Sequence, residues 1–181
     1  MTLTSQSHER AETNSARISP SRITVARLRR GLTNAELAAH LDVAPATLSR
    51  WENEGPPPSH TEFILERLET ALGFSAGYFL SPELEVPSMD STLFRAGSRA
   101  TLRQKSVAVA SGANARTLLA WLRRNFNFPE PNLPDLSGFT PAEAARHART
   151  IWQLGDKPVP NSVQLAESLG IAVMGLPPAA S

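Results

Sequence analysis

The sequence contains no cysteine among its 181 residues. This absence excludes disulfides, thiolate metal sites and a cysteine nucleophile, and it fits a reducing compartment. No apolar run approaches the roughly 20 residues that a membrane-spanning helix requires. The polar N-terminal segment lacks the apolar stretch of a signal peptide. We therefore expect a cytoplasmic protein with no membrane partner.

The formal net charge of +1 conceals an uneven distribution of charge along the chain. Residues 1–87 hold 8 basic and 11 acidic side chains, whereas residues 88–126 hold seven basic side chains and one acidic one. Clustering of one sign of charge creates a local field that the total does not reveal. The middle of the chain is therefore a candidate for contact with an anionic partner.

The spacing of apolar residues and the helix-boundary residues predict a mainly α fold. Residues 20–80 are expected to form a five-helix domain, and residues 99–181 a small helical module with at most one short strand, at 171–176. Residues 1–19 are rich in Ser, Thr and Glu and predict a flexible arm. Residues 81–98 contain two prolines and predict a linker.

Local signals mark the helix boundaries of the first domain. Ser21 is a candidate cap for its first helix. Thr33 and Glu36 have the spacing of a capping box. Asp42 stands in the turn that follows, where aspartate tolerates a left-handed backbone, and Pro45 suits the first turn of the next helix. Two short helices joined by so tight a turn predict a helix-turn-helix motif.

The sequence around this turn carries a longer pattern: Leu37-Ala38, then Asp42-Val43, then Leu48-Ser49-Arg50-Trp51-Glu52. The pattern resembles the Xre-type (lambda repressor and Cro-like) family over residues 21–80, which implies a five-helix DNA-binding domain. The chain departs from the family at Asp42, which replaces the turn glycine, and at Ala44, which replaces the usual Ser or Thr cap of the recognition helix.

The resemblance implies two sets of DNA-contacting residues. The residues at base-facing positions are Pro45, Ala46, Thr47 and Arg50. The residues at phosphate-contacting positions are Thr33, Asn34, Ala44 and Asn53. Arg50 is the sharpest candidate, because a guanidinium can fork onto O6 and N7 of guanine. The alanine at position 44 removes a side-chain cap and one phosphate contact.

Two further features of residues 20–80 have structural explanations as well. Trp51 lies at helical spacing from Leu48 and is expected in the core rather than against a base. Arg27, Arg29 and Arg30 are basic side chains of the first helix that either face phosphate or form a solvated face.

Residues 92–177 resemble the region between the helix-turn-helix and the zinc peptidase of Xre-type proteins fused to an ImmA/IrrE domain. The matching segments are Pro129–Leu136, Trp152–Gly155 and Pro158–Val173. Such peptidases need two histidines four residues apart with a glutamate beside the first. The histidines of this chain do not supply that pattern; they are His8, His40, His60 and His147. We therefore expect no metal site, no cofactor and no enzymatic activity.

Three roles are open for this module. It can form a homodimer, bind a regulatory protein or ligand, or make a second contact with DNA. The basic residues for that second contact are Arg95, Arg99, Arg103 and Lys105. Its basic residues can equally form a solvated helix surface.

Together these features favour a sequence-specific DNA-binding transcription regulator, a repressor that occupies an operator on double-stranded DNA. The resemblance to the fusion proteins implies a role in phage or prophage immunity, in the cytoplasm of a bacterial or phage-infected host cell. The alternative is a protein-interaction module, such as an antitoxin-like protein, in which DNA binding is secondary. The acidic excess of residues 1–87 favours that alternative.

Overall fold

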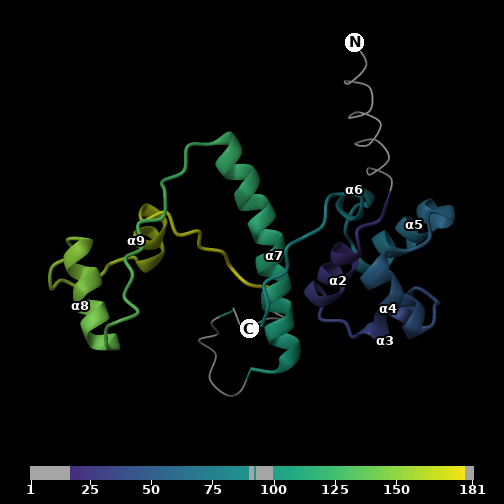
Figure 1. Ribbon diagram of the computed structural model, residues 1–181, viewed down its shortest axis with the longest axis horizontal. Helices are drawn as coiled ribbons and strands as arrows, with labels where there is room; N and C mark the ends of the chain where they lie inside the picture. Colours follow the sequence, from purple (N-terminus) through teal and green to yellow (C-terminus); the bar gives the residue numbers. More distant parts are fainter. Residues whose placement is uncertain (1–16, 90–91, 93–99, 178–181) are drawn as a thin grey trace, which may run out of the picture. The chain divides into compact units, whose positions relative to one another are not determined.

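The structure is a computed structural model that describes residues 17–89, 92 and 100–177 (Figure 1). The helices of this part of the chain are α2 (Pro20–Arg29), α3 (Asn34–His40), α4 (Pro45–Glu54), a 3-10 turn (Pro58–His60), α5 (Thr61–Leu72), α6 (Ala76–Phe79), α7 (Leu102–Asn125), α8 (Pro141–Ile151) and α9 (Ser162–Ser168). The predicted mainly α fold, with five helices in its first domain, is confirmed. None of these helices is long and apolar enough to cross a bilayer.

The expectation of a short strand at residues 171–176 was wrong. No strand occurs in the described residues, so the apolar segment from Ile171 has no neighbouring strand with which to form a ladder. The amide of Ile171 instead donates to the carbonyl of Ala166 (3.0 Å), which completes the end of α9.

The chain divides into two compact units between Thr117 and Leu118. The first unit contains α2 to α6 and the start of α7, and residues 118–175 form the second. The first unit therefore extends beyond the linker predicted at 81–98. Ile18, which precedes α2, is buried in the core of this unit.

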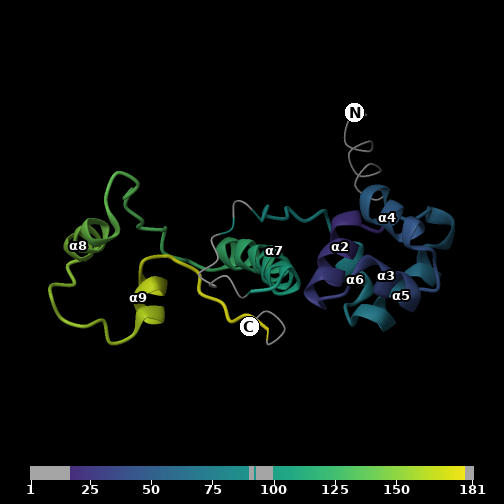
Figure 2. The same ribbon diagram turned by 90° about the horizontal axis from the view of Figure 1, so that it is seen from below.

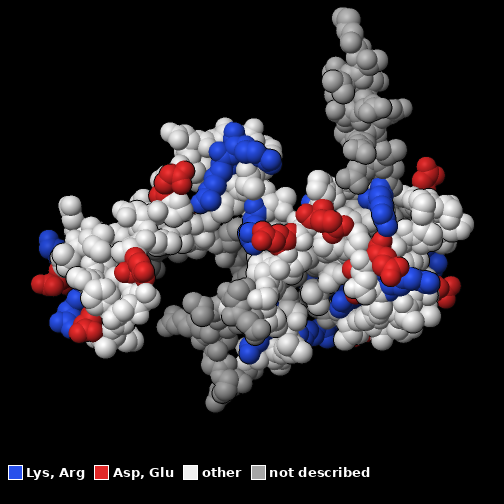
Figure 3. Space-filling model, viewed as in Figure 1, with Lys and Arg blue, Asp and Glu red and all other residues white. Residues whose placement is uncertain are grey.

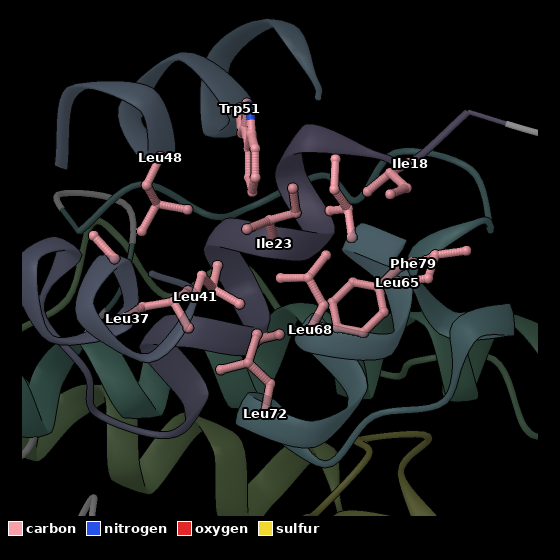
Figure 4. Packing of buried hydrophobic residues seen from close by; sticks show 13 residues of the cluster. Ile18, Ile23, Leu37, Leu41, Leu48, Trp51, Leu65, Leu68, Leu72 and Phe79 are labelled. Carbon is pink, nitrogen blue, oxygen red and sulfur yellow. The ribbon is translucent and has the colours of Figure 1, made fainter. Parts of the chain in front are cut away.

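A single apolar core holds α2 to α6 together (Figure 4). Leu48 and Trp51 of α4 point toward Ile23 of α2. Trp51 is 9% exposed, which confirms its predicted place in the core. The buried members of the core are Ile18, Ile23, Ala26, Leu37, Ala38, Leu41, Leu48, Trp51, Ile64, Leu65, Leu68, Leu72 and Phe79.

Local boundary signals act as predicted at three places and differ at one. Thr33 and Glu36 form the capping box of α3, and Asp42 has the expected positive φ of 51° in the turn. α4 begins at Pro45. The first helix starts one residue before Ser21, because Ser19 is its N-cap and the Ser21 hydroxyl instead accepts a hydrogen bond from the amide of Leu84 (2.7 Å).

The second unit has well-defined helix starts and little buried core. α8 begins with a capping box between Thr140 and Glu143, and Asn161 caps α9 by accepting from the amide of Gln164 (3.0 Å). Among residues 118–175, all of which are described, Ala148 alone is buried.

The start of α7 lies beside α2 (Figures 1 and 2). The contact between these two helices is made by small side chains. Ala110 and Ala113 of α7 are almost inaccessible and cluster with Val25 of α2. The Tyr78 hydroxyl of α6 donates to Oδ1 of Asn114 on the same side of α7 (2.9 Å). Small residues let two helices approach closely, and the hydrogen bond links α7 to α6 as well.

We expect the free energy of unfolding to fall as pH rises above 10. Burial raises the pKa of Tyr78 above its ordinary value of 10.0, against smaller opposing effects of Arg22 and of the hydrogen bond to Asn114. The folded state therefore keeps a proton that the unfolded state releases, so stability is full below the unfolded-state pKa and is lost as pH rises through the folded-state pKa.

Tyr78 is the one tyrosine of the chain, so tyrosinate absorbance in the native protein follows this residue alone. Urea unfolding across the same pH range measures the loss of stability, and Tyr78→Phe is expected to remove this part of it. A native titration midpoint at or below the ordinary value contradicts the prediction.

Candidate nucleic-acid interface

The recognition helix predicted from the sequence has one buried and one exposed face. Leu48 and Trp51 of α4 enter the core, while the opposite side faces outward. The predicted base-facing residues all lie in its first two turns and outside the core: Pro45, Ala46, Thr47 and Arg50. Thr47 is half-buried and the other three are exposed.

Arg50 carries a guanidinium with no partner in the described part of the chain. It makes no hydrogen bond or ion pair there, and its side chain is exposed. A guanidinium presents five N–H donors in a planar fork. All five remain available for a ligand with paired acceptors.

No side chain caps the start of α4, so the backbone amides of its first turn are not covered by a capping side chain. Ala44 is the N-cap residue, with φ −67° and ψ 144°, and makes no side-chain cap hydrogen bond. Its carbonyl accepts from the amides of Thr47 (2.9 Å) and Leu48 (3.2 Å). Ala44 and Ala46 have small side chains, so a ligand can approach the backbone at this end of the helix closely.

The predicted phosphate-contacting residues lie at three separate places on α3 and α4. Thr33 and Asn34 lie at the start of α3, Ala44 at the start of α4 and Asn53 in the last turn of α4. The Thr33 hydroxyl is already engaged with Glu36, to whose Oε2 it donates (2.9 Å). Asn53 donates one Nδ2 hydrogen to the carbonyl of Ser49 (2.9 Å), so its second N–H donor and its amide oxygen remain available for a ligand. The phosphate-contacting roles of these four residues stay predictions.

An ion pair joins α2 to α4. Arg27 donates from Nε to Oε1 of Glu52 (2.6 Å) and from Nη2 to Oε2 (3.0 Å). Its Nη1 donates to the carbonyl of Leu32 (3.0 Å). The two side chains are only 12% and 11% exposed, so solvent screens the pair weakly. Arg27 and Glu52 therefore orient α4, a role that sequence reasoning missed.

Other arginines of α2 are also used within the protein. Arg30 donates to the carbonyls of Leu72 (2.5 Å) and Gly73 (3.3 Å) at the end of α5, and its guanidinium lies 5.3 Å from the ring centre of Phe74. Arg29 makes no hydrogen bond or ion pair with the described residues. The sequence left open whether these arginines face phosphate or form a solvated surface. Arg27 and Arg30 do neither, because both bind acceptors within the protein.

The basic residues predicted to make a second DNA contact divide into three cases. Arg95 and Arg99 lie outside the described residues. Lys105 has an interaction partner within the chain. Arg103 is exposed on the first turn of α7 and makes no hydrogen bond or ion pair with the described residues.

The helix-turn-helix does not present a uniformly basic surface on the face drawn in Figure 3. Lys and Arg side chains are interspersed there with Asp and Glu side chains. Affinity for a polyanion at this face would depend on a few well-placed cations rather than on a continuous basic patch.

Residues 25–79 match a family of helix-turn-helix domains. No curated protein and no solved structure matches the chain. The match covers the second half of α2 and all of α3 to α6, and it contains every buried member of the core described above except Ile18 and Ile23. Residues 25–79 are therefore an Xre-like helix-turn-helix domain, and such a domain indicates a DNA-binding transcription regulator.

We expect Arg27→Met to lower the free energy of unfolding by about 3 kcal/mol, because it leaves the Glu52 carboxylate largely buried and unpaired. Urea unfolding measures this loss. Arg29→Met, on the same helix, removes a side chain without a partner in the described residues and should change stability by less than about 0.5 kcal/mol.

The double variant Arg27→Met with Glu52→Leu tests the same pair. Replacing both partners by apolar side chains removes the unpaired charge, so it should cost clearly less than the sum of the two single changes. Equal losses of unfolding free energy for Arg27→Met and Arg29→Met would show that the ion pair does not stabilise the fold.

Proposed function

We propose that the protein is a sequence-specific repressor that acts by occupying operator DNA. The observation that carries the proposal is the guanidinium of Arg50, which is exposed on α4 and has no partner among the described residues. The residues at the start of the same helix have small side chains. A helix enters the major groove with its N-terminal residues against the base edges. Arg50 would fork onto O6 and N7 of a guanine, a contact worth about 1–3 kcal/mol of discrimination.

The neighbouring residues supply the rest of the proposed interface. Pro45 and Ala46 let the helix backbone approach the bases, and Thr47 offers a methyl group to thymine or a hydroxyl to a base edge. Thr33, Asn34 and Asn53, with the backbone at Ala44, contact phosphates and set the register of the helix without reading sequence.

A homodimer is the proposed binding species. Two copies of α4 would read two half-sites about 34 Å apart, one turn of DNA, so that a two-fold operator matches a two-fold protein. Occupancy of a promoter by such a dimer blocks transcription without any chemistry of the protein's own.

The proposed setting is phage or prophage immunity in a bacterial or phage-infected host cell. Its support is the resemblance of residues 92–177 to the middle region of Xre-type proteins fused to an ImmA/IrrE domain. The same resemblance leaves room for a regulatory protein that binds this region.

Selection of bound duplexes from a random DNA pool tests the proposal. The wild-type chain is expected to enrich one motif with two-fold symmetry and a guanine in each half-site. Arg50→Ala should lose preference at that guanine, because the paired donors are gone. Arg50→Lys keeps the charge without the fork and should retain affinity while losing much of the discrimination.

Arg124→Ala is the matched control for charge, since it removes an exposed arginine of α7 outside the helix-turn-helix. It should leave the motif unchanged. If the wild-type protein enriches no motif, the repressor proposal fails and a protein-interaction module becomes the better account.

A further inference from the structure

We propose that Arg103 of α7 binds a backbone phosphate of the DNA beside the turn between α2 and α3. The proposal rests on the DNA binding proposed above. It assigns to a residue outside the helix-turn-helix a part in the same interface. The argument depends on where α7 is held, what its first turn contacts and whether its charge is free.

α7 is held on the helix-turn-helix along several of its turns. The packing of Ala110 and Ala113 and the hydrogen bond from Tyr78 fix its middle, as described above. Arg116 adds an ion pair with Glu85, with 2.6 Å between Nη2 and Oε2. The position of the first turn of α7 therefore follows from contacts within one compact unit.

That first turn lies against the turn between α2 and α3. Gly31 ends α2 with φ +67°, and a Cβ atom placed on it would lie 3.0 Å from Nε of Arg103 and 3.4 Å from Cγ2 of Val107. The absence of a side chain at Gly31 thus makes room for the Arg103 guanidinium. Thr33 and Asn34, which follow Gly31 by two and three residues, are the predicted phosphate-contacting residues of this turn.

The charge of Arg103 is free to meet a phosphate. Arg103 is exposed and makes no hydrogen bond or ion pair with the residues that the structure describes. The positive charge of Arg103 acts on Glu36, whose pKa is lowered chiefly by its hydrogen bonds with Thr33 and to a smaller extent by Arg103 and His40. Arg103 therefore places a positive charge close to the first turn of α3.

The placement supplies a cation to a helix-turn-helix that has no excess of positive charge, since residues 20–80 hold six basic and seven acidic side chains. Arg27 and Arg30 are engaged inside the fold. Arg29 has no partner among the described residues but is half-buried, whereas Arg103 of α7 places an exposed cation at this turn. Arginine suits the task, because its fork can meet two phosphate oxygens at once. A phosphate contact of this kind adds affinity for every DNA sequence alike.

The salt dependence of DNA binding tests the proposal with the full chain and a duplex carrying the selected motif. Arg103→Ala should make the slope of log affinity against log salt concentration shallower by about 0.9, the value for one phosphate contact. It should weaken binding to specific and scrambled duplexes by the same factor. Arg103→Lys, which keeps the charge, should restore most of the slope.

Arg124→Ala is the matched control, because Arg124 is an exposed arginine of the same helix that makes no hydrogen bond or ion pair with the described residues and takes no part in holding α7. It should leave the slope unchanged, and urea unfolding should show that both alanine variants are folded. An unchanged slope for Arg103→Ala, or equal changes for Arg103→Ala and Arg124→Ala, would overturn the inference while leaving the proposed function intact. Absence of binding by the wild-type chain would overturn both.

Discussion

The position of α4, the proposed recognition helix, depends on the pairing of Arg27 with Glu52. α4 has ten residues and buries only Leu48 and Trp51, and two apolar anchors on so short a helix leave its rotation weakly determined. The two parallel hydrogen bonds from the Arg27 guanidinium fix that rotation from α2, and a third to the carbonyl of Leu32 ties the following turn to the same side chain. The outward direction of Arg50 is a consequence of this arrangement.

Much of the first domain could be predicted because its signals are local. The capping box at Thr33, the left-handed turn at Asp42 and the helix start at Pro45 involve residues within four positions of one another. Features that depend on distant partners could not be predicted. Ser21 bonds to the amide of Leu84, and the apolar segment at 171–176 lacks a second strand in the described residues.

The same distinction applies to the site. The small residues and Arg50 were recognisable from their order along one helix, but the fate of each remaining arginine was not. Arg27 and Arg30 find acceptors 25 and 42 residues away. Arg22 is nearly buried and donates to the carbonyl of Pro82, 60 residues away (2.7 Å). Burial of a cation requires such acceptors, and only the folded chain shows where they are.

The length of α7 has a mechanical consequence. With 24 residues it measures about 36 Å from end to end, and only its first two thirds belong to the unit that contains the helix-turn-helix. A continuous helix is stiff, so a torque applied at Trp121 or Leu118, both about half exposed, would be transmitted to its other end. The small alanine contacts at 110 and 113 would then serve as a pivot. α7 would then act as a lever that turns about these two alanines, and the part of the helix that precedes them lies beside the turn that follows α2.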